Sequence, residues 1–280
     1  MISETIQKYK VEAVIHLAAD AYVDESVTQP LKYFRNNVAN TLNLLEAQFD
    51  LGVKYIVFSS TCATYGIPNR TPIREGDELH PVNPYGETKL VVERMLHWCG
   101  QAHHLRWVVL RYFNAAGADP AGEIGECHDP ETHLIPPALQ AAMGERSSVD
   151  VFGNDYPTRD GTALRDYIHV TDLADAHVRA LKYLCEGGES RAFNLGTGTG
   201  HSVREVISSV ERVSGRRVNI RECPRRPGDP LILIADSESA CNVLGWKPLH
   251  SSLDEIVATA WRWQSQQKSL LTGTEQQRTG

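Results

Sequence analysis

Short, continuous runs of apolar residues alternate with stretches of helical periodicity in the first part of the chain. The apolar runs are VEAVIHLAA (11–19), KYIVFSS (54–60) and LRWVVLRYFN (105–114), and each is typical of a strand buried on both faces of a sheet. Helical spacing over 30–51 and 83–100 fills the intervals, and a glycine ends each of these helices. The alternation predicts an α/β fold with a doubly wound parallel sheet.

The pattern changes after Asn114, where Gly, Pro and acidic residues predict a loop over 115–132. Further expected elements are a helix over 134–144, a strand over 149–153, a helix over 170–184 with Thr171 as its N-cap, a strand over 191–198, and helices over 202–215 and 253–264. We expect one domain over 1–114, to which segments near 149–185 and 191–198 return. A second, interleaved and smaller domain covers 115–267, and a polar tail over 268–280 is expected to fray.

Composition narrows the class of protein. The chain of 280 residues is 41% hydrophobic and 22% charged, with a formal net charge of −7, so neither nucleic acid nor an anionic membrane is an expected partner. No apolar run is long enough for a transmembrane helix, and the polar N-terminus MISETIQKYK lacks the apolar core of a secretory signal. Six scattered cysteines without metal-ligand spacing predict free thiols in a reducing cytoplasm and no metal site.

Small and polar residues follow the three apolar runs, in HLAA, SST and YFN. In open α/β sheets ligands bind outside the carboxyl ends of the strands, so these residues are expected to line one crevice. Within NPYGETK, Tyr85 and Lys89 lie four apart on one helical face. An ammonium group lowers the pKa of a nearby phenol, which makes a tyrosine, a lysine and the Thr61 hydroxyl a candidate acid/base set. An exposed helix pair is the alternative interpretation of Tyr85 and Lys89.

Several motifs together make the chain resemble the extended short-chain dehydrogenase/reductase family, and within it the UDP-sugar 4-epimerases. The resemblance extends to about residue 265, and its motifs include FSSTCATYG, NPYGETK, LRYFNAAGADP, HLIPPALQAA and RRPGDP. The most specific is DYPTRDGTALRDYIHV. A Rossmann-like domain for NAD over 1–114 and a UDP-sugar domain over 115–267 are implied by this resemblance.

The resemblance also implies roles for individual residues. Tyr85 is the acid/base, Lys89 holds the nicotinamide ribose and lowers the tyrosine pKa, and Thr61 supplies the hydroxyl. The other implied NAD contacts are Ala18, Ala19, Asn36, Ser59 and Tyr112. The implied UDP-sugar contacts are Thr61, Asn114, His133, Leu134, Phe152, Arg165, Arg226 and Asp229. The implied reaction interconverts UDP-galactose and UDP-glucose through a 4-keto sugar, with NAD bound throughout, and relatives often form homodimers through helices matching 30–51 and 83–100.

Structural alternatives exist for several of these residues. Arg165 could pair with Asp166 or Asp172 on the surface, and Arg226 could pair with Asp229. Asn36 and Asn37 could form a cap or a turn. His16 at the end of its strand is expected to be a hydrogen-bonded core residue.

One family feature is missing from the sequence. Relatives open with a strand and a G-x-x-G-x-x-G turn, and none precedes residue 16, so the resemblance implies that about 60 residues, roughly two βα units, are absent. GTGTG at 196–200 follows a different strand and lies too late to be that turn. We expect unpaired apolar surface beside the first strand.

Three rival functions share parts of this pattern. Cys62 and Ala63 follow Thr61 where the 4,6-dehydratases carry Asp-Glu, which argues against elimination chemistry. An epimerase for UDP-xylose/arabinose or UDP-N-acetylhexosamine remains open, because Leu233 at the position that gates acetamido groups is of intermediate size. A chain that binds UDP-sugar without catalysis is the third alternative.

Overall fold

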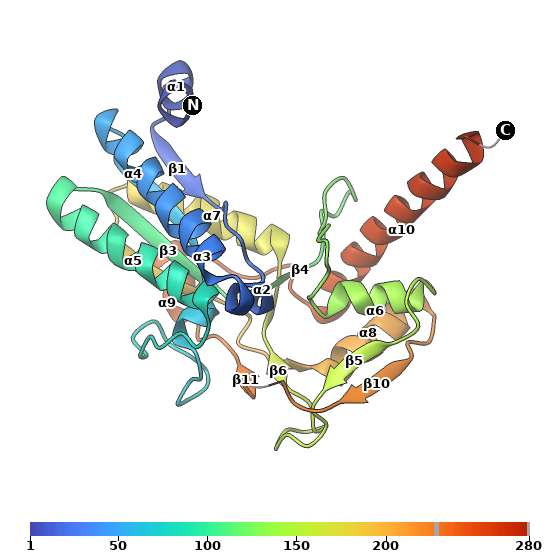
Figure 1. Cartoon of the computed structure of the whole chain (residues 1–280). Coiled ribbons are helices and arrows are strands. Elements are labelled where there is room, and N and C mark those ends of the chain that lie inside the picture. Colours follow the sequence, from blue (N-terminus) through green and yellow to red (C-terminus); the bar gives the residue numbers. More distant parts are fainter. Residues whose placement is uncertain (227–229, 279–280) are drawn as a thin grey trace. The chain divides into compact units, whose positions relative to one another are not determined.

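The computed structural model describes residues 1–226 and 230–278 and divides into two compact units (Figure 1). Unit 1 comprises Met1–Phe113, Ala174–Leu195 and Ala235–Trp246; unit 2 comprises Asn114–Leu173, Gly196–Ile234 and Lys247–Gly280. The predicted return of 149–185 to the first domain differs from this division, because residues 149–173 belong to unit 2. Their strand pairs there with a partner that the sequence pattern did not identify.

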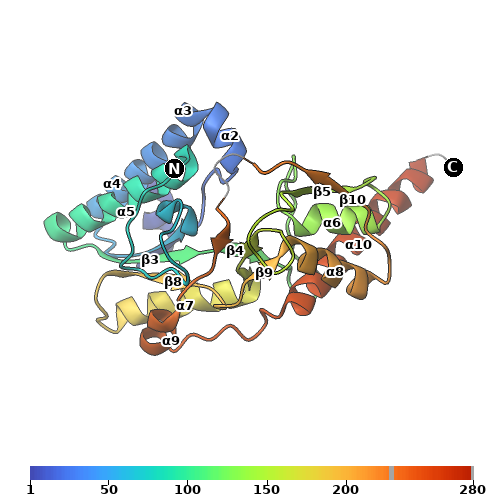
Figure 2. The same cartoon turned by 90° about the horizontal axis from the view of Figure 1, so that it is seen from below.

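Unit 1 is built on the predicted parallel sheet, which is confirmed. Its strands are β1 (Ala13–His16), β2 (Tyr55–Thr61), β3 (Arg106–Tyr112) and β8 (Arg191–Leu195), in the order β1-β2-β3-β8 and all parallel. Figure 2 shows α4 (Asn40–Asp50) and α5 (Pro84–His103) on one face, and α7 (Val170–Cys185) and α9 (Glu238–Leu244) on the other. The sheet therefore has helices on both faces, as a doubly wound fold requires.

The alternation of side chains along β2 explains its continuous apolar run. Ile56 and Phe58 point into a core that also contains Leu45 of α4, Val92 and Leu96 of α5, and Val109 of β3. Val57 and Ser59, on the opposite face, are buried as well. A central strand covered by helices on both faces needs apolar or hydrogen-bonded residues at every position.

The prediction that residues 11–19 form a strand buried on both faces is wrong. All four residues of β1 are half-buried, and Leu17 just beyond it is 60% exposed. The reason is its position, since β1 is an edge strand that pairs with β2 alone among the described residues. The expectation for His16 is confirmed, because its Nε2 lies 2.9 Å from Thr41 Oγ1 and burial lowers its pKa to about 4.

The helix expected over 30–51 is divided into three parts. These are α3 (Pro30–Tyr33), the π-helical turn η1 (Phe34–Ala39) and α4. Short helices that the sequence did not predict are α1 (Ile2–Tyr9) and α2 (Val23–Thr28), and η2 (Cys62–Tyr65) is a 3₁₀ turn directly after β2. π-helical turns interrupt α-helices most often at functional sites.

Unit 2 has small paired strands and three helices in contact with one another. Its helices are α6 (Ile135–Ala142), α8 (Val203–Ser214) and α10 (Leu253–Arg278). Its strand pairs are β5 (Val149–Phe152) with β10 (Ile220–Cys223), β4 (Asn114–Ala116) with β7 (Tyr167–His169), and β6 (Leu164–Arg165) with both β9 (His201–Ser202) and β11 (Ile232–Leu233). The core between the helices contains Leu139, Val206, Val210, Ile256 and Val257.

Two helix ends differ from the sequence predictions. α7 begins at Val170, so Thr171 lies inside the helix, while the Asp172 carboxylate accepts hydrogen bonds from the backbone of Leu249 and His250. α10 continues through the predicted polar tail to Arg278. By contrast, Ser202 caps α8 through a reciprocal capping box with Glu205, as its sequence suggests. In the described part of the chain, no helix combines the length and apolar character needed to cross a membrane.

Candidate active site

The candidate acid/base residues of unit 1 come from β2 and the first turns of α5. Thr61 ends β2, and its Oγ1 accepts a 3.1 Å hydrogen bond from Ala63 N at the start of η2. Asn83 caps α5 by accepting a 2.8 Å hydrogen bond from Gly86 N, which places Tyr85 and Lys89 in the first two turns. A Cβ on Gly86 would lie 2.6 Å from the Ala63 carbonyl oxygen, so only glycine permits this close contact between the two segments.

Lys89 is turned into the protein instead of toward solvent. Its side chain is buried, its Nζ donates a 2.9 Å hydrogen bond to the Ser59 carbonyl oxygen, and it lies 4.9 Å from the Phe58 ring centroid and 6.0 Å from that of Tyr85. Burial of the ammonium lowers the pKa of Lys89 to about 8. The alternative of an exposed helix pair is therefore excluded.

The pKa of Tyr85 differs from the sequence expectation. Burial of the phenol raises its pKa, the nearby Tyr112 adds to this, and the Thr61 hydroxyl acts in the opposite direction. Desolvation favours the neutral phenol, so the protein without a bound ligand keeps Tyr85 protonated. The expected lowering of the Tyr85 pKa by Lys89 is not the dominant effect.

A buried network of charged and polar side chains holds the carboxyl end of β2. Ser60 Oγ donates to Glu93 on α5, and Arg111 on β3 donates to both oxygens of that carboxylate. Arg111 Nη1 also donates a 3.0 Å hydrogen bond to Tyr65 Oη, whose own hydroxyl donates to Asn194. The network connects β2, β3, η2 and α5, so the elements that carry the site residues are held together by buried hydrogen bonds.

The implied NAD contacts occupy different elements of unit 1. Ser59 is buried with its hydroxyl 2.6 Å from His177 Nε2, and the Tyr112 ring lies 6.3 Å from that imidazole. Ala18 and Ala19 follow the edge strand β1. Asn36 lies inside the π-helical segment η1, and its Oδ1 accepts a hydrogen bond from Asn40, so it neither caps a helix nor lies in a β-turn.

Two buried residues that contact candidate site residues were not identified from the sequence. Asn37, next to Asn36, is 3% exposed and hydrogen-bonded through its amide to the backbone of Asp20 and to Thr88. His177 contacts Ser59 from α7. No local pattern signals a hydrogen bond across about a hundred residues, but Asn37 could have been found from its place on the buried face of the predicted helix.

The implied UDP-sugar contacts other than Thr61 lie in unit 2, and the structure brings two of them together. The Arg226 guanidinium lies 3.9 Å from the Phe152 ring centroid, a stacked arrangement. Arg165 donates to the Leu164 carbonyl, and Asn114 pairs with Tyr167 between β4 and β7. Leu134 packs against the core at the start of α6, and His133 contacts Glu126. Asp229, the possible partner of Arg226, lies outside the described residues.

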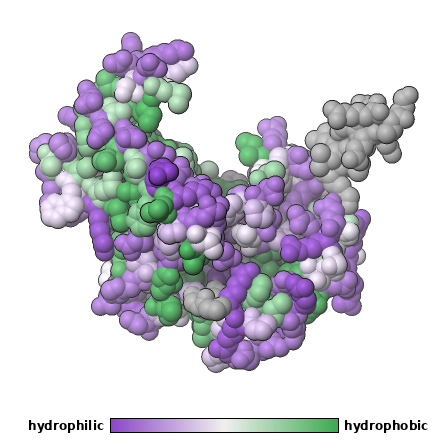
Figure 3. Space-filling model, in the orientation of Figure 1, coloured by the Kyte–Doolittle hydropathy of each residue, from purple (hydrophilic) through white to green (hydrophobic). Residues whose placement is uncertain are grey.

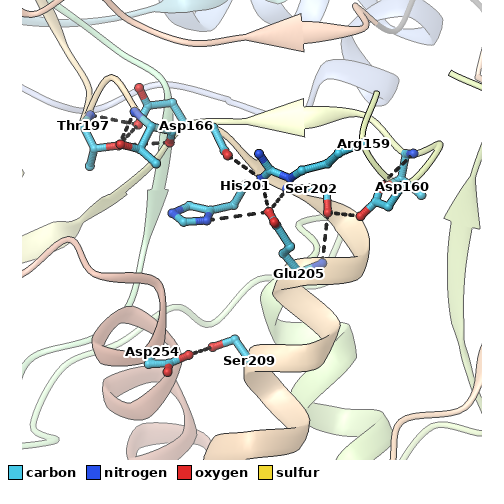
Figure 4. Close-up of polar contacts among 12 residues, drawn as sticks. Arg159, Asp160, Asp166, Thr197, His201, Ser202, Glu205, Ser209 and Asp254 are labelled. Carbon is cyan, nitrogen blue, oxygen red and sulfur yellow. Dashed lines mark hydrogen bonds and ion pairs between the residues drawn. The ribbon is translucent and has the colours of Figure 1, made fainter. Parts of the chain in front are cut away.

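The backbone N–H groups of the GTGTG segment bind a carboxylate of the protein itself, that of Asp166. The buried Asp166 carboxylate accepts hydrogen bonds from Thr197 N at 2.8 Å, from the Thr197 hydroxyl at 2.7 Å and from Gly198 N at 3.0 Å (Figure 4). Successive backbone N–H groups in such a turn attract an anion, and here the protein supplies it. The prediction that this segment is not the dinucleotide turn agrees with this arrangement. Asp166 is fully buried and is therefore not a surface residue.

Comparison with known proteins places this geometry in a family. The model of the NAD dependent epimerase/dehydratase family matches residues 1–196. The chain belongs to this family. Among its relatives is a UDP-glucose 4-epimerase of Halalkalibacterium halodurans, 54% identical over 255 residues, which are 91% of this chain and 76% of the relative.

Solved structures of this family share the fold. The UDP-glucose 4-epimerase from Brucella ovis in complex with NAD is 53% identical, with a TM-score of 0.91 over 94% of this chain and 81% of that one. The enzyme from Bifidobacterium longum in complex with NAD+ and UDP is 39% identical, with a TM-score of 0.89 over 95% and 79%. The resemblance noted from the motifs is confirmed.

Proposed function

We propose that this protein is an NAD-dependent UDP-glucose 4-epimerase, an isomerase that interconverts UDP-galactose and UDP-glucose. The observation that carries the proposal is the buried Lys89 ammonium beside Tyr85 and Thr61, in a chain of a family whose members at 50–54% identity are UDP-glucose 4-epimerases. A lysine that only served solubility would extend into solvent, whereas this one is 3% exposed.

The residues of unit 1 fit a bound NAD. Lys89 has three N–H donors, and within the described residues one of them has a hydrogen-bond partner, the Ser59 carbonyl. A buried ammonium with unused donors suits the hydroxyl groups of a ribose, which is the role proposed for Lys89. Further contacts to NAD are proposed for Ala18, Ala19, Asn36, Ser59 and Tyr112. When bound, NAD supplies the reversible hydride acceptor that this reaction needs.

The acid/base steps follow from the positions of the three site residues. Tyr85, as a phenolate, takes the proton from the sugar O4 while the C4 hydrogen leaves as hydride. The Thr61 hydroxyl, which already lowers the Tyr85 pKa, is placed to share the proton with O4. The 4-keto sugar turns over, the hydride returns to its opposite face, and Tyr85 gives the proton back to O4. The sugar regains the proton and the hydride that it lost, so the reaction involves no net oxidation.

Charge explains why Tyr85 needs its neighbours. Burial raises its pKa in the protein alone, so a phenolate at neutral pH requires positive charge in the site. Lys89 and a positively charged nicotinamide ring supply it together. We therefore propose that Tyr85 becomes a base only when the cofactor is bound. Without NAD, Tyr85 stays protonated and takes no proton from the sugar.

Unit 2 supplies the proposed contacts to the UDP-sugar. Arg226, stacked on Phe152, and Arg165 offer guanidinium donors for the two phosphates. Asn114, His133, Leu134, Asp229 and the Thr61 hydroxyl of unit 1 complete the proposed set. The structure of the Bifidobacterium longum relative in complex with UDP supports a uridine nucleotide as the ligand.

Homodimer formation and a cytoplasmic role in galactose metabolism belong to the same proposal. Leu31 and Leu42 of the predicted dimer helices are 77% and 47% exposed, and Trp98 on α5 is 66% exposed. Figure 3 shows hydrophobic residues among hydrophilic ones over the part of unit 1 that carries α3 and α4. Large exposed apolar side chains on adjacent helices favour an interface with a second copy. Six free cysteines favour a reducing compartment.

The test is conversion by the purified full chain supplied with NAD. UDP-galactose is added, UDP-glucose is followed by a coupled UDP-glucose dehydrogenase, and bound NAD is measured after denaturation. Conversion that is lost in Tyr85→Phe and kept in the control Tyr9→Phe, an exposed tyrosine, supports the proposal. Retained NAD with conversion of only a pentose or N-acetyl UDP-sugar would overturn the substrate, and a chain without NAD or conversion would overturn the activity.

A further inference from the structure

Two E-x-H pairs in the loop before α6 bring four potential metal ligands together. The segment ECHDPETH contains Glu126, His128, Glu131 and His133, and one ligand atom of each lies within 4.8 Å of the others. All four belong to unit 2 and to eight consecutive residues. The family motifs assign His133 to the UDP-sugar and give no role to the other three residues.

The donor atoms face a common centre. His128 Nδ1 lies 3.0 Å from Glu126 Oε1 and 3.6 Å from Glu131 Oε2. His133 Nδ1 is hydrogen-bonded to Glu126 and lies 3.8 Å from Glu131 Oε1. The two imidazole rings are 5.2 Å apart between centroids. Each histidine thus directs the same ring nitrogen at the same two carboxylates.

We propose that Glu126, His128, Glu131 and His133 form a binding site for a divalent transition metal of the Zn²⁺ class. Four ligands at Zn²⁺ distances of about 2.1 Å form a tetrahedron with edges of about 3.4 Å. The nitrogen–oxygen separations in the structure are 3.0, 3.6 and 3.8 Å, the last two to different oxygens of Glu131, so side-chain rotation has to bring one oxygen of each carboxylate to the ion. Binding requires the His133–Glu126 hydrogen bond to open, which side-chain rotation at these partly exposed residues allows.

The ligand types select the class of metal. Imidazole nitrogens suit Zn²⁺, Co²⁺ and Ni²⁺, whereas Mg²⁺ and Ca²⁺ prefer all-oxygen sites. Two neutral histidines and two carboxylates carry a charge of −2, which a divalent ion neutralises.

The backbone around the cluster is held in place from both sides. Trp263 Nε1 on α10 donates a 3.0 Å hydrogen bond to the Glu126 carbonyl oxygen, and the Trp263 ring fills the space that a Cβ on Gly125 would need. His133 N donates a 2.8 Å hydrogen bond to Glu131 Oε1, two residues before α6 begins. These contacts hold the backbone at the two ends of the segment that carries the four residues.

A bound ion would connect the start of α6 to the loop anchored on α10. It would therefore stabilise the folded state by an amount that grows with the logarithm of its free concentration above the dissociation constant, as any ligand of the native state does. Metal on His133 would also remove that ring from the proposed UDP-sugar contact. The metal site needs no UDP-sugar, so its test is independent of the proposed reaction.

The experiment uses the full chain after treatment with a chelator. Co²⁺ is titrated and followed by the visible absorption of four-coordinate Co²⁺, and Zn²⁺ stoichiometry and affinity are measured by competition with a chromogenic chelator. The expected result is one Zn²⁺ per chain, with affinity at least tenfold lower in His128→Ala and in Glu131→Gln. His80→Ala is the matched control, because His80 faces one carboxylate, Glu78, on the surface of unit 1 and should bind no metal.

Two results would overturn the site. One is the absence of Zn²⁺ binding by the unmodified chain, and the other is equal Zn²⁺ affinity in the unmodified chain and His128→Ala. Thermal unfolding with Zn²⁺ present provides a second readout, in which the unmodified chain and His80→Ala should gain stability and the two ligand variants should not. A folded His128→Ala variant without this gain separates lost metal binding from lost structure.

Discussion

Replacing Lys89 by methionine should make the free energy of unfolding less dependent on pH. Methionine matches the length of the lysine stem without its charge. The pKa of Lys89 falls from 10.5 to about 8 on burial, and each unit corresponds to about 1.4 kcal/mol. Keeping this ammonium charged in the folded protein therefore costs about 3 kcal/mol at neutral pH.

The direction of the pH effect follows from proton binding. Between the folded pKa of about 8 and the unfolded value of 10.5, the unfolded chain binds more protons, so stability rises with pH. From neutral pH to about pH 9.5 this group should add about 2 kcal/mol to the free energy of unfolding. Other groups titrate in this range too, but they are common to both chains and cancel in the difference.

The assay is urea unfolding of the parent chain and Lys89→Met at both pH values, monitored by tryptophan fluorescence. The parent should gain about 2 kcal/mol more than the variant. At neutral pH the variant should also be more stable, by about 1–2 kcal/mol, after allowing for the lost hydrogen bond to Ser59. Equal pH dependence in the two chains would refute the burial of a charged Lys89. Loss of epimerase activity in the stabilised variant would show that the charge is kept for function.

Three further predictions concern activity and structure. Thr61→Val should lower kcat by about 10²-fold or more while Thr61→Ser, which keeps the hydroxyl, should retain conversion; equal rates would contradict the proton-sharing role. Glu93→Gln should lower the free energy of unfolding by about 3–5 kcal/mol, because Arg111 would stay buried without its counter-charge, and an unchanged urea midpoint would disprove this. Asp166→Asn should cost about 1–3 kcal/mol and speed hydrogen exchange at the Thr197 and Gly198 amides, whereas unchanged exchange would argue against the carboxylate as their acceptor.

Local pattern predicted the elements of unit 1 well. Continuous apolar runs gave β2 and β3 as buried parallel strands, because a strand with helices on both faces must be apolar on both sides. Tyr85 and Lys89 were placed on one helical face from spacing alone. The edge position of β1 agrees with the unpaired surface expected beside the first strand, but the apolar run alone did not show it, since a strand carries no local mark of which neighbours it pairs with.

In the candidate site, local sequence pattern predicted the residues but not their burial or their long-range contacts. The sequence identified Thr61, Tyr85 and Lys89 as a set, but it predicted a lowered pKa for Tyr85, and burial in the folded protein reverses that direction. Asn37 and His177 were missed because their contacts join residues distant in the chain. Direct charge interactions can be anticipated from spacing, whereas desolvation depends on everything packed around the group.

The sequence by itself determined the parallel α/β architecture, the helix that carries Tyr85 and Lys89, and the family motifs, since each depends on side-chain periodicity or on short segments. Only the tertiary structure decided that Lys89 points inward to the Ser59 carbonyl and that residues 149–173 belong to unit 2. The tertiary structure also brings one ligand atom of each residue in the two E-x-H pairs within 4.8 Å of the others. The physical reason is common to these cases, because burial, strand pairing and the path of a loop are set by contacts that no short stretch of sequence contains.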